Sequence, residues 1–203
     1  KIYYNIGKLE ESKELYFELI ELKPNNLKYI DELIDVVTLL EDYKSLNKTY
    51  NMKLAFLSEP ERITLLLEMA SIAFEKLNQV EEAKSYLEKI IVLNPNNVKA
   101  LNNLLFIYKD VKDYENWIRI ALLKADLGLD NENIFDEVAS VYKNNLNNIE
   151  QFIVFTKKSL DLNITSEKLL KIKDIFNQNK NILIADLLIE YYSKNNEFEE
   201  EKL

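Results

Sequence analysis

The motif LKPNN at Leu22–Asn26 decides how this sequence folds, because it returns as LNPNN at Leu93–Asn97. The similarity extends backwards from both copies, so that Leu9–Ile20 matches Val80–Ile91. In both stretches apolar or small residues recur every three or four positions, as in the buried stripe of an amphipathic helix. Proline then ends the helix, and Asn-Asn supplies turn chemistry before the next one. The sequence therefore predicts repeated pairs of helices.

The repeat has a period of about 34 residues, and its clearest copy is Thr64–Asn97. One step of this size carries Ala83 to Trp117, and a further step with one extra residue leads to Phe152. The step back from Thr64–Asn97 to the preceding copy is slightly longer than the period, and the additional residues fall near Ser58–Pro60, where a loop can accommodate them. We expect helices at about residues 8–22, 26–40, 43–57, 60–77, 80–93, 97–110, 114–127, 131–145, 149–161, 166–178 and 181–194.

Two helices in a unit of this length are the signature of the tetratricopeptide repeat, and the chain resembles that family over nearly its whole length. The resemblance implies an all-α fold, a right-handed superhelical α-solenoid of antiparallel helix pairs. Trp117 and Phe152 stand where the family prefers alanine, so we expect the packing to depart from the family there. The family's large, small, aromatic, small and proline sites are occupied by Leu67, Ala70-Ser71, Phe74, Ala83 and Pro95.

We expect one array over residues 1–203, with no separate second domain. Its first helix has no complete partner upstream, where only Ile2-Tyr3-Tyr4 remains. We therefore expect the chain to begin within a repeat and the native protein to continue N-terminally. The acidic end at Glu197–Glu201 is either a frayed tail or the start of one more helix. The expected units are a partial repeat at 1–26, repeats at about 27–63, 64–97, 98–131 and 132–166, and a degenerate pair at 167–203.

Composition excludes several classes of function. The formal net charge of −9 argues against nucleic acid and against an anionic membrane surface as partners. No apolar run approaches the roughly eighteen residues that a transmembrane helix needs. The chain has no His and no Cys, so the commonest general base, the commonest metal ligands and disulfides are all missing. Adjacent carboxylates on such charged helices are solvated surface, and we expect no enzyme activity, cofactor or metal site.

The resemblance also implies a concave surface, lined by the first helix of each repeat, that holds an extended peptide or a helix of a partner. Asp31, Asp35 and Glu68 occupy sites that a clamp for the carboxylate terminus of a chaperone needs to be basic or amide, so such a tail is disfavoured. The N-terminal half of the groove should prefer a basic or neutral peptide. The candidate groove residues are Lys28, Asp31, Asp35, Glu68, Ile72, Glu75, Lys99, Asn102, Phe106, Lys109, Asn133, Asp136, Ser140 and Lys143.

The function that these features favour is a non-catalytic scaffold that binds another protein, as yet unidentified. An alternative is the interaction arm of a larger enzyme or of a cell-envelope assembly whose other domain lies outside this segment. Self-association through the open ends of the array is a further alternative.

Overall fold

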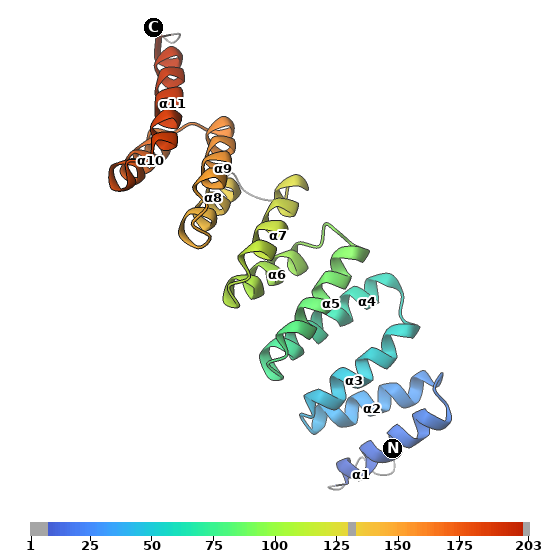
Figure 1. Cartoon of the computed structure of the whole chain (residues 1–203). Helices are drawn as coiled ribbons and strands as arrows, with labels where there is room; N and C mark the ends of the chain where they lie inside the picture. Colours follow the sequence, from blue (N-terminus) through green and yellow to red (C-terminus); the bar gives the residue numbers. More distant parts are fainter. Residues whose placement is uncertain (1–7, 130–132, 201–203) are drawn as a thin grey trace. The chain divides into compact units, whose positions relative to one another are not determined.

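The computed structural model describes residues 8–129 and 133–200, and the side chains up to Lys194. Over these residues the chain is all-α, and Figure 1 shows its helices in sequence order. The helices follow the expected ranges closely at nearly every end. They are α1 (Leu9–Leu22), α2 (Leu27–Leu39), α3 (Tyr43–Lys53), α4 (Glu59–Ser71), α5 (Val80–Leu93), α6 (Val98–Asp110), α7 (Tyr114–Asp126), α8 (Ile134–Asn144), α9 (Ile149–Leu162), α10 (Ser166–Asn179) and α11 (Ile182–Glu200).

The chain divides into two compact units, residues 1–107 and 108–203, which we call the first and the second unit. The division falls within α6. Each unit is an α-solenoid segment made of antiparallel helix pairs, in which short turns place consecutive helices side by side.

In the first unit α1 packs on α2, α2 on α3, and α4 on α5. The stripe predicted from the repeat forms the core: Ile30, Ala83 and Leu87 are completely buried. A buried apolar stripe on each of two adjacent helices stabilises the pair through apolar contact with little help from polar groups. The core of this unit therefore follows the sequence period.

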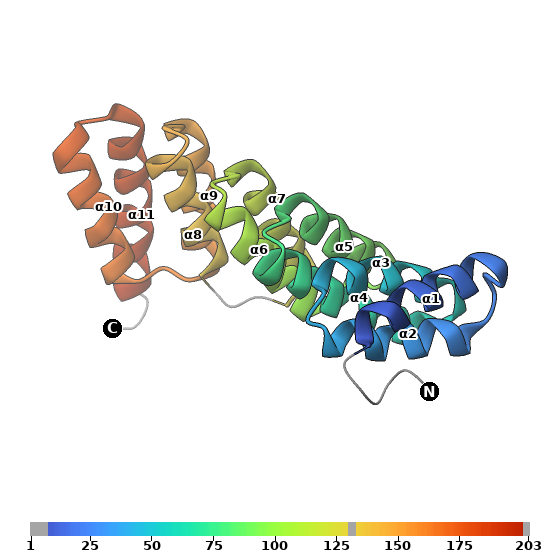
Figure 2. The ribbon, with the colours of Figure 1, turned by 90° about the horizontal axis from the view of Figure 1, so that it is seen from below.

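In the second unit α8 packs on α9, and α10 packs on α11, as Figure 2 also shows. Helix α11 also contacts α9, and α7 contacts α8. The bulky residues at the alanine sites, Trp117 and Phe152, are 6% and 5% exposed and so belong to the core. Tyr142 stacks on Phe155 with ring centroids 5.4 Å apart, which extends the aromatic packing between α8 and α9.

The turn inside each pair has a distinct chemistry. The residues Glu41, Asn78, Lys112, Asn147 and Lys180 all have φ between +50° and +59°, and each follows the first helix of its pair. This left-handed position ends the helix and turns the chain back, a role that glycine usually fills. The second helix then begins with an N-cap in several pairs. Asp42 accepts a hydrogen bond from the Ser45 amide at 3.0 Å.

Three features lie outside the expected helix pattern. A short 3₁₀ turn, η1 (Leu54–Phe56), extends α3, and a π-turn, η2 (Ile72–Lys76), extends α4. The π-turn is marked by the Leu77 amide, which donates to the Ile72 carbonyl five residues back at 3.1 Å. Helix α11 continues to Glu200, so most of the acidic end is helical and not a frayed tail. The segment Ile2-Tyr3-Tyr4 lies outside the described residues.

Candidate protein-binding groove

Each unit contains an open cavity of the same construction. It lies between the first helices of two successive pairs, and the second helix of the earlier pair forms its floor. In the first unit the cavity lies between α4 and α6 over α5 and measures about 700 Å³; we call it the first groove and define it by Glu68, Ser71, Phe74, Glu75, Lys99 and Phe106. In the second unit it lies between α8 and α10 over α9 and measures about 530 Å³; this second groove is defined by Asp136, Ser140, Lys143, Thr156, Lys168 and Lys171.

The first groove has an aromatic wall. Phe106, on α6, is 63% exposed and meets Phe74 of η2 edge to face, with ring centroids 5.9 Å apart. The floor between them is apolar, since Leu87 is completely buried and lines the cavity. The π-turn carries both Phe74 and its neighbour Glu75, and both line the cavity. Such turns occur frequently at functional sites, because they re-aim the side chains of one helical turn.

A buried tyrosine fixes one carboxylate of the first groove. The Tyr50 hydroxyl, on α3, donates a hydrogen bond to Glu68 Oε1 at 2.7 Å. Burial, followed by this contact with the Glu68 carboxylate, raises the pKa of Tyr50 well above its ordinary value. The phenol therefore stays protonated at any physiological pH and keeps donating. Glu68 is exposed yet held in place, which is unusual for a surface glutamate.

The other charges of the first groove are exposed. Glu75 and Lys99 both line it, and within the described residues neither takes part in a hydrogen bond or an ion pair. With Glu68 they leave the groove with one net negative charge. The arrangement can therefore accept a cation beside an apolar group.

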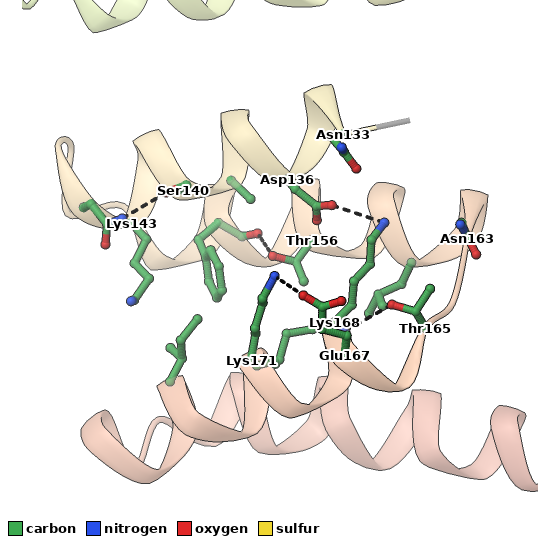
Figure 3. Close-up of a pocket in the computed structure, with 16 residues that line it drawn as sticks. Asn133, Asp136, Ser140, Lys143, Thr156, Asn163, Thr165, Glu167, Lys168 and Lys171 are labelled. Carbon is green, nitrogen blue, oxygen red and sulfur yellow. Dashed lines mark hydrogen bonds and ion pairs between the residues drawn. The ribbon is translucent and has the colours of Figure 1, made fainter. Parts of the chain in front are cut away.

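The second groove is more polar (Figure 3). Lys168 reaches from α10 to Asp136 on α8, with Nζ to Oδ2 at 3.1 Å. Its Nζ also donates a hydrogen bond to Ser159 Oγ at 2.7 Å. Its side chain is only 16% exposed, so this cation links α8, α9 and α10 more than it offers itself to a ligand. The floor is polar at Thr156, whose hydroxyl donates to the Phe152 carbonyl at 2.7 Å.

Two further lysines line the second groove nearer to solvent. Lys171 Nζ lies 2.8 Å from Glu167 Oε1 on the same helix. This contact lowers the pKa of Glu167 and raises the pKa of Lys171. Both side chains are largely exposed, so the pair contributes little to stability. Lys143 lines the groove from α8, where Asn144 donates to Ser140 Oγ at 2.9 Å. The charged residues of this groove sum to one net positive charge.

The structure brings together only part of the predicted groove residues. Glu68, Lys99 and Phe106 line the first groove with Glu75, and Asn133, Asp136 and Ser140 line the second with Lys143. On α6, Asn102 and Lys109 are exposed but line neither groove, and Asn103 lines the first in their place.

On α2 the predicted residues line neither groove. Lys28 and Asp35 are exposed, while Asp31 Oδ1 lies 2.8 Å from Lys53 Nζ on α3. Asp31 thus has a cation beside it within its own helix pair.

The placement of Ile72 in the groove was wrong. This residue is 9% exposed and belongs to the core. The family register implies an exposed side chain at this site, but α3 and α5 both pack against η2, which carries Ile72. The apolar character of Ile72 was the sequence signal for this outcome.

Lys168 and Lys171 also line the second groove, although neither was predicted as a groove residue. Two repeat steps with one extra residue carry Lys99 to Lys168, so the period could have identified it. The pair α10–α11 was too degenerate in sequence to suggest that register. The Tyr50 hydrogen bond had no sequence signal at all, because it joins two repeats through side chains alone.

In the described part of the chain, no three or more acidic, His or Cys side chains come together in a way that could hold a metal ion. Within the same residues, none of the helices combines the length and the apolar character that crossing a membrane requires.

Comparison with known proteins finds matches to part of this chain. A family model described as tetratricopeptide repeat matches residues 1–26 and 64–97, the second range being the unit that the sequence marks most clearly. The uncharacterized protein ycf37 of Pyropia yezoensis is 32% identical over 133 residues, which cover 64% of this chain and 62% of that protein. The match thus spans less than two thirds of that relative's length.

Similar solved structures include the MamA protein, with 13% identity, a TM-score of 0.44 and coverage of 76% of this chain and 82% of that one. YrrB, described as a TPR protein with an unusual peptide-binding site, has 18% identity and a TM-score of 0.44, and the match covers 85% of this chain and 87% of that one. A tetratricopeptide repeat protein from Parabacteroides merdae has 19% identity and a TM-score of 0.38, and the match covers 90% of this chain and 77% of that one. Residues 1–26 and 64–97 thus match the tetratricopeptide repeat, and the described helices are paired as in an α-solenoid of such repeats.

Proposed function

We propose that this chain is a scaffold that holds a segment of a partner protein in its grooves. The observation that carries the proposal is Phe106, a large aromatic side chain left 63% exposed on the wall of the first groove. Large apolar side chains that line a cavity beside a few placed polar groups are typical of binding sites. Phe106 has no structural need to be aromatic, because the buried residues of α6 already fill its core face.

The shape of the grooves favours a protein segment as the ligand. Both cavities are open along the helices, and both mix apolar surface with amide and charged side chains. An extended segment needs such alternation, because its backbone requires hydrogen-bonding partners while its side chains require pockets. Members of this family generally act as non-catalytic scaffolds that bind other proteins. The alternative, in which the chain is the interaction arm of a larger enzyme or envelope assembly, uses the same grooves and stays a prediction.

A bulky residue placed in the first groove tests the proposal. Ser71 is exposed and lines the groove, so Ser71→Trp should fill it without entering the core. Glu18→Trp, on the exposed face of α1, is the matched control. Proteins captured by the unmodified chain and by the control, but lost with Ser71→Trp, are groove partners. Equal capture by all three forms, with equal melting temperatures, would contradict a role for the first groove.

A further inference from the structure

The first groove combines an aromatic wall with two carboxylates, and this combination specifies the chemistry of its ligand. We propose that it selects partner segments in which a bulky apolar side chain is flanked by lysine or arginine. The inference rests on the proposed function, because it takes for granted that a partner segment enters this groove. It goes further in naming which segments bind and which are rejected.

The apolar part of the ligand follows from the size and lining of the cavity. A volume of about 700 Å³ is enough for one or two large side chains. Phe106 and Phe74 present an edge-to-face pair, and Leu87 closes the floor. An aliphatic or aromatic side chain placed there would cover the exposed ring of Phe106 and remove apolar surface from water.

The basic part of the ligand follows from the carboxylates. Glu68 lies on α4 and Glu75 on η2, and both line this cavity. Tyr50 holds Glu68 in place, and no cation of the described chain pairs with either glutamate. Glu75 directly follows Phe74, so its carboxylate belongs to the same turn as the aromatic wall. A lysine or arginine next to the apolar side chain therefore finds a carboxylate that nothing in the described chain neutralises.

Among the described residues, Lys99 is the one cation that lines the first groove, and it weakens the groove's preference for basic segments. It lines the groove from the first turn of α6, whereas Phe106 lies two turns further along the same helix. An acidic flank could reach Lys99 only at the cost of facing two glutamates. The net charge thus opposes acidic segments, although one cation is present.

The second groove provides an internal comparison. Two repeat steps carry Glu75 to Lys143, and with the extra residue they carry Leu87 to Thr156. The same construction therefore has a cation where the first groove has its free carboxylate, and a hydroxyl where the first has an apolar floor. The preference that we propose belongs to the first groove and does not follow from the repeat architecture alone.

The test uses three synthetic peptides on a glycine–serine background, each with a central leucine. The flanking residues are lysine in one, serine in the second and glutamate in the third. Binding to the full chain is measured by fluorescence anisotropy at low and at high salt. We expect the lysine-flanked peptide to bind about five- to tenfold more tightly than the glutamate-flanked one at low salt, with the ratio falling as salt rises.

Single substitutions assign that preference to residues. Glu75→Gln should bring the lysine-to-glutamate ratio down to about twofold, since it removes one of two attracting charges. Glu18→Gln, on α1 outside the groove, is the matched control and should leave the ratio unchanged. Phe106→Ala should weaken all three peptides by a similar factor of about ten, because it removes the apolar wall common to them. Circular dichroism melting shows that each variant is folded.

The outcomes separate the inference from the proposed function. If Phe106→Ala weakens every peptide but the flanking charge has no effect, the groove binds segments and the charge inference is wrong. Tighter binding of the glutamate-flanked peptide would overturn it as well. If none of the peptides binds, or if Phe106→Ala changes nothing, the charge inference fails. Partner capture that survives Ser71→Trp would then overturn the proposed function for this groove too.

Discussion

Glycine in place of Lys112 should stabilise the protein, because the backbone there adopts a conformation that suits glycine best. Lys112 has a φ of +59° and lies in the turn after α6. Its amide donates to the Lys109 carbonyl at 3.2 Å, and glycine keeps that bond. The side chain is exposed, and within the described residues no hydrogen bond or ion pair involves it. The substitution therefore relieves the backbone and removes no contact that the structure shows.

The size of the effect is a difference between two terms. The left-handed conformation costs a residue with a Cβ roughly 1–2 kcal/mol. Glycine avoids that strain but loses more conformational freedom on folding, which costs about 0.5–1 kcal/mol and offsets part of the gain. We expect Lys112→Gly to raise the free energy of unfolding by about 0.5–1 kcal/mol, which corresponds to roughly 1–4 °C in Tm for a chain of this size. Glu41, with a φ of +53° in the turn after α2, should respond in the same way.

Urea unfolding followed by circular dichroism measures the change. Asn78→Gly is the matched control, because Asn78 has a φ of +52° but asparagine tolerates this region far better than lysine. It should therefore shift the midpoint much less. If Lys112→Gly destabilises the chain, or if Asn78→Gly gains as much, backbone strain at these turns is not the source of the effect.

Three other substitutions test polar contacts of the fold. Burial alone would raise the pKa of Asp42, but hydrogen bonds from the Ser45 hydroxyl and amide and from Lys13 outweigh it and lower that pKa. The Asp42 carboxylate therefore stabilises the fold at neutral pH, and this stabilisation is lost as the pH falls through the lowered value. Asp42→Ala should cost about 1 kcal/mol at pH 7 in urea unfolding. Its deficit relative to the unmodified chain should shrink as the pH falls below the ordinary pKa of 3.8 and vanish below the lowered value. Asp113→Ala is its control, because Asp113 caps α7 without a lysine partner in the described part of the chain. Lys168→Met should destabilise the second unit by roughly 1–3 kcal/mol, because it leaves a completely buried hydroxyl and a carboxylate without their donor, and a smaller loss would show that they find other partners. Tyr50→Phe should cost about 1 kcal/mol in thermal unfolding and weaken binding of the lysine-flanked peptide by freeing Glu68, and unchanged affinity would show that this carboxylate does not need to be held.

The helices could be predicted from sequence because their signals are local. Apolar periodicity, proline at the end of a unit and polar turn residues all act within one repeat, and the resulting helix ends mostly agree with the structure. The exceptions include α11, which extends past its expected end to Glu200, and η1 and η2, where the helix changes its hydrogen-bond pattern without a change in apolar spacing. A π-turn is compatible with many sequences, so nothing in Ile72–Lys76 predicts it.

The grooves could be predicted only in part, because their lining depends on contacts between repeats. The family register assigns Glu68, Phe106 and Ile72 to one groove; Glu68 and Phe106 line one cavity, whereas Ile72 is buried. Whether a position on a first helix faces the cavity or the neighbouring pair depends on how closely that pair approaches. Ile72 is buried on η2, against which α3 and α5 both pack, and this packing is a tertiary property that spacing along one helix cannot encode.

Binding specificity in such an array therefore depends on a small number of exposed positions. Most positions of the buried stripe are apolar in both units, and the two grooves share their construction. The exposed positions lie outside this stripe, so Glu75 and Lys143 can carry opposite charges at equivalent sites. The period predicts which positions are equivalent in successive repeats, whereas the residue types at those positions determine which ligands the groove can bind. For this chain the most informative identities are the exposed phenylalanine and the two glutamates beside it, since they define a ligand chemistry that peptides of matched sequence can test.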